Sequence, residues 1–248
     1  MKNLLLLFSL LLITNLSFSQ RPEYDDLKVL FADANYEKLV KKAEGYTLKD
    51  KTKKDVLPYI WLSKGLFKIS TSDNQDDKFK NAYKQSIKHM GKAIKYDLKY
   101  NNMATVAEHE DYLHELQLSL QIRIENEMAG ETTGGFKKGY SWALNYKKIS
   151  INLISINFVS GSCKYFSGDK PGARSEWQTG NKALEEIESL DSWSEADKLL
   201  LKLGVLYTAK AYNSSNQKDK ARSLLGRVSQ WFEEDPDWQE KYDEIVNN

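Results

Sequence analysis

The three histidines, His89, His109 and His114, are the side chains best suited to bind a metal or to transfer a proton near neutral pH. Two of them lie in the stretch "HEDYLH", which is one residue longer than the motif of helical zinc sites. At about 100° per residue, a spacing of five puts the two imidazoles roughly 140° apart around a helix. Because side chains on such different faces cannot coordinate the same metal ion, we interpret both histidines as surface or half-buried helix residues. We interpret the isolated His89 in the same way.

Two polar stretches contain residue types that bind phosphate or calcium in other settings. The first, "GETTGG" at 130–135, lacks the Gly-Lys-Ser/Thr ending of a phosphate-binding loop, and a helical pattern precedes it where a strand should. The second, "SDNQDD" at 72–77, lacks the alternation and the central glycine of a calcium loop. We interpret the first as a loop and the second as a turn that caps the next helix.

Other catalytic signatures are missing from the sequence. It contains no nucleophile elbow, no Cys–His pair, no dinucleotide fingerprint and no Glu-Ser-x-Gly stretch of the kind found in helical glycosidases of the cell wall. Charged residues make up 29% of the chain, so pairs such as Glu185-Glu186 do not single out catalytic carboxylates. We therefore expect a non-enzymatic protein without a cofactor or a metal site. An exported helical enzyme acting on cell-wall or glycan material stays open as the alternative.

The N-terminal residues have the layout of a secretory signal peptide. Lys2 precedes an apolar run at 4–13, and the small residues Ser17 and Ser19 follow at a spacing of two. The run is short for a membrane span, although an N-terminal anchor is the alternative. We predict a signal peptide over residues 1–19, which excludes this segment from the fold.

The chain has a single cysteine, Cys163, and its position bears on membrane anchoring, on disulfide bonding and on the role of its thiol. It lies far from the cleavage site, so the chain lacks the cysteine that anchors a bacterial lipoprotein. A single cysteine also excludes an internal disulfide. Because "FVSGSCKYF" is apolar and small, we expect Cys163 to be a buried hydrophobic residue. We therefore predict a periplasmic or secreted protein that is not a lipoprotein and does not insert into the membrane after signal cleavage.

The charge balance gives no support to a nucleic-acid partner. The chain has 36 lysines and arginines against 35 aspartates and glutamates, and loss of Lys2 with the signal peptide makes the two equal. The mature chain of about 229 residues is long enough to bury its own core. Its 4 prolines and 13 glycines are typical of a helical globular protein.

Apolar residues recur at helical spacing along nearly the whole mature chain. We expect about ten or eleven helices in antiparallel pairs within one domain over residues 20–248. The segment at 150–166 is rich in isoleucine and valine and also fits a strand, but helical patterns flank it, so we interpret it as a buried helix. The other expected helices are two short ones within 24–46, then 56–70, 78–97, 103–128, 136–149, 166–191, 194–215, 217–234 and 235–248.

One spacing of small and large residues occurs twice. In "FSGDKPGARSEWQTGNKALEEIESLD" (166–191), Ala173 is followed four residues later by a tryptophan and seven residues later by a glycine. Ala221 is followed at the same distances by a leucine and a valine. Twelve residues before each alanine stands another small residue, Gly161 or Ala209. The full frame comprises Gly161, Ala173, Trp177, Gly180, Ala209, Ala221, Leu225 and Val228.

This spacing resembles the tetratricopeptide repeat (TPR), in which small residues let two antiparallel helices approach and a bulky residue fills the space against the next pair. "SGDKPGA" is similar to the Gly-Asp-x-x-x-Ala turn of that family, and "KAIKYD" is similar to its usual repeat ending. The frame covers residues 152–236, and 56–97 matches loosely. The resemblance implies an all-α fold in which antiparallel helix pairs stack as a TPR-like α-solenoid; a non-repetitive helical bundle is the alternative.

The resemblance also implies a function, because proteins of this family generally bind peptides or partner subunits in a concave groove lined by the first helix of each pair. Carried over by position, the groove residues are Ser162, Tyr165, Lys210 and Asn213. We therefore expect an adaptor or scaffold in a bacterial envelope that binds a protein or peptide. The lysine- and asparagine-rich composition is similar to that of Bacteroidota secretory proteins.

Aromatic residues gather near the C-terminus, at Trp231, Phe232, Trp238 and Tyr242. Asp235-Pro236 is a good N-cap and first-turn pair for a last helix. We expect that helix to cap the final pair, with an exposed docking patch as the alternative.

Overall fold

The computed structural model describes residues 23–72 and 76–247, and the predicted signal peptide at 1–19 lies outside them. The described residues form twelve α-helices and one short 3-10 helix and contain no strand, which confirms the all-α prediction. The helices are α2 (Asp25–Ala32), α3 (Tyr36–Leu48), α4 (Val56–Ser70), η2 (Asp77–Phe79), α5 (Ala82–Tyr100), α6 (Ala104–Ala107), α7 (Glu110–Ala129), α8 (Thr133–Tyr146), α9 (Ile154–Phe166), α10 (Lys170–Leu184), α11 (Glu195–Ser214), α12 (Lys218–Ser229) and α13 (Pro236–Asn247).

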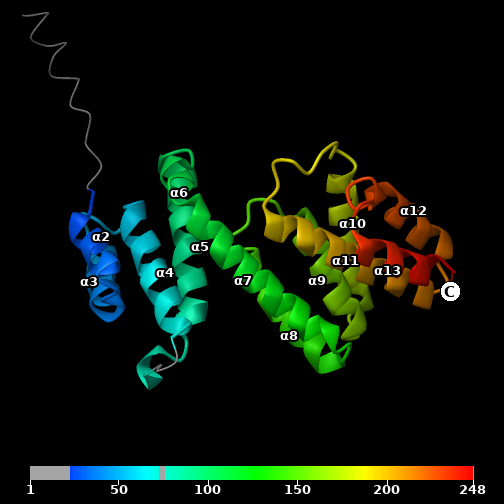
Figure 1. Cartoon of the computed structure of the whole chain (residues 1–248), viewed down its shortest axis with the longest axis horizontal. Coiled ribbons are helices and arrows are strands. Elements are labelled where there is room, and N and C mark those ends of the chain that lie inside the picture. The colour runs from blue at the N-terminus through cyan, green and yellow to red at the C-terminus, as the bar shows by residue number, and fades with distance from the viewer. Residues whose placement is uncertain (1–22, 73–75, 248) are drawn as a thin grey trace, which may run out of the picture.

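The helices follow one another in chain order along the long axis of the molecule. Figure 1 shows α2 and α3 at one end, α7 and α8 in the middle, and α12 and α13 at the other end. Most helices pack against their neighbours in sequence, while α11 also reaches back to α9 and α7. Within the described ranges, no helix has both the length and the apolar character needed to cross a membrane.

The apolar core consists of three clusters spread along this axis. One cluster joins α2 to α5 and includes Leu27 and Trp61, and a second lies among α4 to α9 and α11 and includes Leu116. The third lies among α9 to α13 and includes Phe158 and Leu225. Because each cluster is built mainly by helices close in sequence, each segment of the array is stabilised chiefly by its own neighbours.

The segment that also fits a strand is a buried helix, as predicted. Every residue of α9 from Ser155 to Cys163 is buried, because α8, α10 and α11 all pack against it. Isoleucine and valine are tolerated here because tertiary packing outweighs their preference for strands. The helical patterns on both sides of this apolar run therefore predict its structure correctly.

The repeating frame of small residues lies at the helix contacts. Ala173 is fully buried, and Gly161 faces Trp177 so closely that a Cβ there would lie within 2.5 Å of the indole Nε1. Gly180 packs on the ring of Phe158, 3.2 Å from a Cβ position. The corresponding residues of the next pair, Ala209, Ala221, Leu225 and Val228, are buried as well. Small side chains thus set the close approach of α10 to α9.

The predicted helix over 103–128 is instead two helices, α6 and α7, separated near His109. The fully buried carboxylate of Asp97 accepts hydrogen bonds from the Val106 backbone N–H at 2.7 Å and from Asn101 Nδ2 at 2.8 Å. This contact turns the chain back over the end of α5, and Met103 adopts a positive φ of 66° at the turn. The break adds one element to the expected number of helices.

Side-chain caps fix the starts of several helices. Asp169 accepts a hydrogen bond from Gly172 N at 2.9 Å and starts α10, and Thr132 does the same for α8 through Gly135 N at 3.0 Å. The stretch "GETTGG", which we expected to be a loop, is one only at 130–132, because its last three residues form the first turn of α8. Asp76 accepts from Lys78 N at the start of η2, whereas residues 73–75 of the predicted acidic turn lie outside the described residues.

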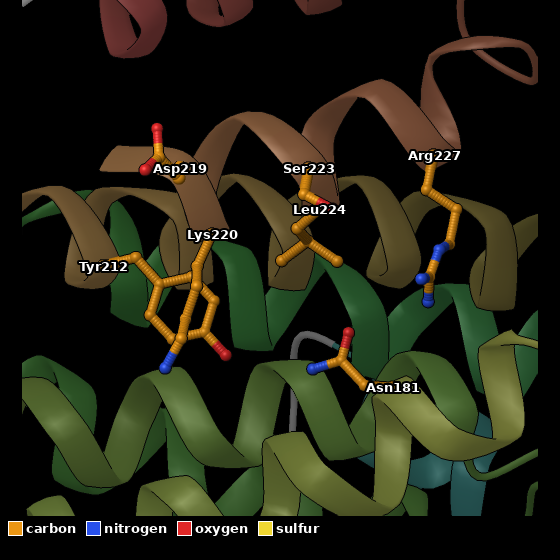
Figure 2. A pocket seen from close by; sticks show the side chains of 7 residues that line it. All are labelled: Asn181, Tyr212, Asp219, Lys220, Ser223, Leu224 and Arg227. Atoms are coloured by element: carbon orange, nitrogen blue, oxygen red, sulfur yellow. The ribbon is translucent and has the colours of Figure 1, made fainter. Parts of the chain in front are cut away.

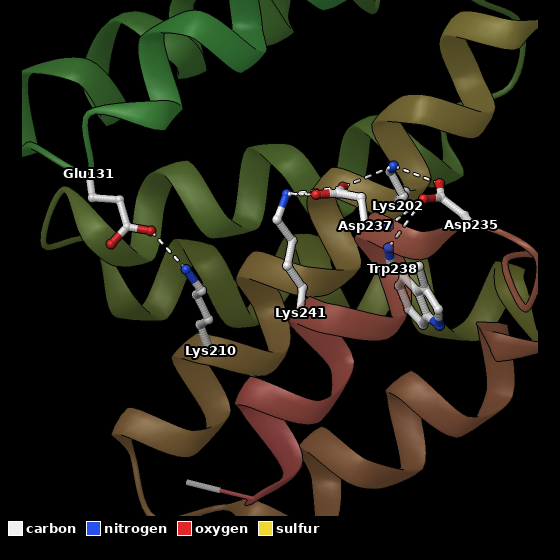
Figure 3. Close-up of polar contacts among 7 residues, drawn as sticks. All are labelled: Glu131, Lys202, Lys210, Asp235, Asp237, Trp238 and Lys241. Carbon is white, nitrogen blue, oxygen red and sulfur yellow. Dashed lines mark hydrogen bonds and ion pairs between the residues drawn. The ribbon is translucent and has the colours of Figure 1, made fainter.

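The last helix lies against α11 and α12. Asp235 caps it by accepting from the backbone N–H groups of Asp237 and Trp238 at 3.0 and 3.2 Å. Lys202 of α11 bridges Asp235 and Asp237 at 2.7 and 3.1 Å, as Figure 3 shows. Trp238 is only 1% exposed, and the other aromatic residues of the tail pack around the same cluster. Trp238 therefore belongs to the core, as expected of a capping helix, while Trp231, Phe232 and Tyr242 are half-buried against it, and the first two also line a surface cavity.

Candidate binding groove between α10 and α12

The histidines do not assemble a reactive centre. His89 and His109 are half-buried, and burial, followed by nearby lysines, lowers the pKa of each imidazole to about 4, so both are neutral at neutral pH. His109 Nδ1 lies 3.2 Å from Lys64 Nζ, and His114 lies 3.4 Å from Glu110. Across residues 23–72 and 76–247, no group of three or more His, Cys, Asp or Glu side chains is placed to hold a metal ion.

Cys163 is fully buried in the second core cluster, as predicted. Burial raises the pKa of its thiol to about 12, so the thiolate is not formed at neutral pH. A Cβ at Gly139 would lie 3.1 Å from its sulfur, which shows how tightly α8 packs on α9 here. The cysteine is a packing residue.

Asp197 is a buried carboxylate that sequence reasoning did not single out. Four hydroxyls surround it: Tyr146 at 2.8 Å, Ser194 at 2.9 Å, Ser150 at 3.3 Å and Ser155 at 3.4 Å. Burial raises the pKa of the carboxyl group, and the hydrogen bonds partly oppose this. The cluster fastens the segment between α8 and α9 to the start of α11, which is a structural role.

The four residues predicted to line a groove do not come together. Ser162 is fully buried between α9 and α11, where its hydroxyl lies 3.0 Å from that of Thr208, so it offers no surface to a partner. Lys210 forms an ion pair with Glu131 at 2.9 Å, beside the start of α8 (Figure 3). Asn213 donates to the backbone carbonyl of Ile245, so α13 covers it.

Tyr165 does reach an open groove, which lies between α10 and α12 with the ends of α9 and α11 as its floor. Two adjoining cavities of about 520 and 330 Å³ make up this α10–α12 groove, and they share Asn181, Tyr212 and Lys220. Figure 2 shows Lys220 and Arg227 extending from α12 toward α10, with Asn181 facing them. The remaining lining residues are Lys170, Arg174, Trp177, Gln178, Ser215, Gln217, Asp219, Ser223 and Leu224.

Three aromatic rings form the floor of the α10–α12 groove. The Trp177 ring lies between those of Tyr165 and Tyr212, with centroid separations of 5.6 and 5.2 Å. Trp177 is almost fully buried and donates from Nε1 to the Phe158 carbonyl at 3.4 Å, whereas the two tyrosines are half-buried. These rings give the groove a rigid base at little cost in side-chain entropy.

Three of the four cations on the walls have no carboxylate partner among the residues that the structure describes. Within the described part of the chain, Lys170, Arg174 and Lys220 form no ion pair. Lys170 Nζ lies 5.3 Å from the centroid of the Tyr165 ring, and Lys220 Nζ donates to Gln217 at 2.8 Å. Arg227, at the other end, pairs with Glu185 at 3.7 Å. The groove is therefore positive in a chain whose net charge is close to zero.

The surroundings of the Tyr165 hydroxyl lower its pKa. Burial alone would raise its pKa, but the hydroxyls of Ser214 and Ser215, at 2.9 and 2.6 Å, and the charge of Lys170 lower it below the ordinary value. A lowered phenol pKa is the expected effect of neighbouring donors and a positive charge.

Comparison of the chain with protein-family models, with curated proteins and with solved structures finds no match in any of the three. The TPR resemblance therefore stays a prediction from the sequence.

The sequence does contain a pattern that points to the groove. Lys170, Arg174 and Gln178 recur every fourth residue and therefore share one exposed face of α10.

Proposed function

We propose that this chain is an exported, non-enzymatic interaction module, a TPR-like adaptor or scaffold of the bacterial envelope that binds a peptide or partner subunit. In this proposal α9 and α10 form one repeat, α11 and α12 form the next, and α13 caps the stack as an α-solenoid. The chain-order array of Figure 1 and the division of the core into three clusters support stacked repeats. The predicted signal peptide and the composition support export from a Bacteroidota-like bacterium.

The observation that carries the proposal is the α10–α12 groove. Its walls present cations and amides, and its floor presents aromatic rings, which is the mixture of anchors and orienting polar groups that interaction surfaces use. Asp219 is the one carboxylate among the lining residues named above, so they hold no pair of carboxylates for acid–base hydrolysis. The groove lies between the second helices of the two pairs, not on the face formed by the first helices.

Affinity purification tests the proposal directly. The mature tagged protein, residues 20–248, is recovered from the envelope fraction of its own cells in three forms: wild type, Arg174→Gln/Lys220→Gln, and Lys88→Gln/Lys95→Gln. All four substituted residues are exposed on helices, so each double variant should fold, which circular dichroism checks. We expect one stable partner with the wild type and with the α5 control, and its loss from the groove variant.

Two other results would contradict the proposal. A partner retained by Arg174→Gln/Lys220→Gln would place the binding site elsewhere. If none of the three forms recovers a partner, the interaction module is wrong, and a screen on glycan substrates would then test the alternative of an exported enzyme.

A further inference from the structure

The charge of the α10–α12 groove points to the chemistry of what it binds. Lys170, Arg174, Lys220 and Arg227 line it, against Asp219 alone among the named lining residues. Three lysines outside the groove are held by carboxylates: Lys147 and Lys164 share Glu176, and Lys202 bridges two aspartates. A concave site with one sign of charge concentrates ligands of the opposite sign.

The spacing of the wall residues suits an extended chain. Lys170, Arg174 and Gln178 follow one another every fourth residue along α10, and all three are exposed and line the groove. Four helical residues rise about 6 Å. Alternate side chains of an extended peptide lie about 6.6 Å apart, since each residue advances about 3.3 Å. A strand-like segment running along α10 therefore presents every second side chain to successive wall residues.

The neutral groups of the groove favour a peptide over a nucleic acid. Side-chain amides of Gln178, Asn181 and Gln217 line it, and amides both donate and accept, as a peptide backbone does. A nucleic-acid strand would need open aromatic faces for its bases to stack on. Trp177 is only 3% exposed, the rings of Tyr165 and Tyr212 pack against it, and Lys170 Nζ lies 5.3 Å from the centroid of the Tyr165 ring, so the floor offers little free aromatic surface for bases.

From these observations we infer that the α10–α12 groove binds an extended acidic segment of a partner protein, with a carboxylate at every second residue. This rests on the proposed function and names the chemistry of the partner. Carboxylates pair with Lys170 and Arg174 on the α10 wall and with Lys220 on the α12 wall, and the intervening aromatic or apolar side chains lie on Tyr165 and Tyr212. The site is built by α10 and α12, so it is distinct from the face that the first helices of the pairs form.

Fluorescence polarisation with synthetic labelled peptides tests this inference on the mature chain. The probes are a peptide in which glutamate and tyrosine alternate, the same peptide with glutamine for glutamate, and one in which the same glutamates form a single block. We expect the alternating acidic peptide to bind about tenfold more tightly than the glutamine peptide at low salt, because several exposed ion pairs add to one another. It should also bind more tightly than the block peptide and weaken as salt rises.

Variants locate the binding. Arg174→Gln should reduce the affinity for the alternating acidic peptide several-fold, whereas Lys95→Gln on α5 should leave it unchanged. Equal affinity for the glutamate and glutamine peptides would overturn the inference. So would tighter binding of oligodeoxythymidine or polygalacturonate in the same assay, because either would assign the groove to another class of polymer.

The two proposals fail in different ways. A partner captured from the envelope through the groove, together with no preference for the acidic peptide, would overturn this inference and leave the proposed function standing. Specific binding of the acidic peptide with no partner captured would overturn the proposed function, while the chemistry assigned to the groove would hold.

Discussion

Gly204 lies at a close approach between α11 and α9. A Cβ at this position would be 2.7 Å from the backbone nitrogen of Val159 and 2.8 Å from the Cβ of Phe158. Backbone atoms cannot move aside as a flexible side chain can, so we expect Gly204→Ala to lower the free energy of unfolding by about 1–3 kcal/mol. Urea unfolding followed by circular dichroism measures this.

Gly226 in α12 is the matched control for that substitution. A Cβ there meets nothing within 4 Å, and the residue is exposed. Gly226→Ala should therefore raise the free energy of unfolding by about 0.5–1 kcal/mol, because alanine loses less backbone entropy in a helix. Equal stability of the two variants would show that α9 and α11 are not in close contact.

His89 makes stability depend on pH. Its ring stacks on Tyr59 with centroids 6.1 Å apart, and its pKa falls from 6.5 to about 4 through burial, followed by the charges of Lys92 and Lys88. Between these values the unfolded chain binds a proton at this position and the folded chain does not. Stability is therefore lost as pH falls through that window.

The variant His89→Phe keeps an aromatic ring and removes the titration. We expect its free energy of unfolding to fall less than that of the wild type when the pH drops from about 7 to about 4.5. Urea unfolding at both pH values gives the comparison. The same loss in both proteins would show that His89 is protonated in the folded state.

Individual residues were predictable where their neighbours in sequence decide their surroundings. Cys163 and Ala173 lie in local patterns of small and apolar residues, and both are buried. The surroundings of Lys210 and Asn213 were not predictable, because their partners, Glu131 and Ile245, are 79 and 32 residues away in sequence. A repeat pattern gives the helix face of a residue but not which distant segment covers it.

Among the elements, α13 provides a large apolar side chain to the last core cluster. Trp238 is 1% exposed and its ring lies 5.2 Å from that of Phe232. Trp238→Ala should cost the C-terminal unit about 3–5 kcal/mol. Hydrogen exchange measured by mass spectrometry should then be faster in α11–α13 and unchanged in α2–α4, because the first and third clusters share no residue.

Trp61→Ala is the reciprocal control, because Trp61 is a buried residue of the first cluster. It should speed exchange in α2–α4 and leave α11–α13 protected. If either variant raised exchange evenly along the whole chain, the molecule would unfold as a single cooperative unit, and the repeat-like division of the core would be wrong.

Helix positions were predictable where the chain carries its own start and stop signals. The helix expected at 56–70 is α4 as observed, with Pro58 in its first turn. The break between α6 and α7 was not predicted, because it depends on Asp97, nine residues before the backbone N–H group of Val106 that it binds. Contacts of this range leave no trace in helical periodicity.

At the scale of the whole molecule, a near-neutral chain forms a long helical array with a positive groove toward its C-terminal end, in which Lys170, Arg174 and Lys220 have no ion pair within residues 23–72 and 76–247. Lys202, Lys210 and Lys241 near the last helices are held in ion pairs, as Figure 3 shows, so they do not add free charge there. The array offers an extended surface, and in the α10–α12 groove aromatic rings and cations without ion pairs line cavities of about 520 and 330 Å³. This arrangement suits capture of a partner segment.

Site-specific photocrosslinking tests the central claim most directly. One form of the mature protein carries benzoylphenylalanine in place of the exposed Gln178 on the groove wall, and a control carries it in place of the exposed Lys95 on α5. Each is irradiated in an envelope extract of its own cells. We predict a discrete crosslinked partner from position 178 and none from position 95. Crosslinking of a copurifying partner from position 95 and not from 178 would contradict a binding site in the α10–α12 groove.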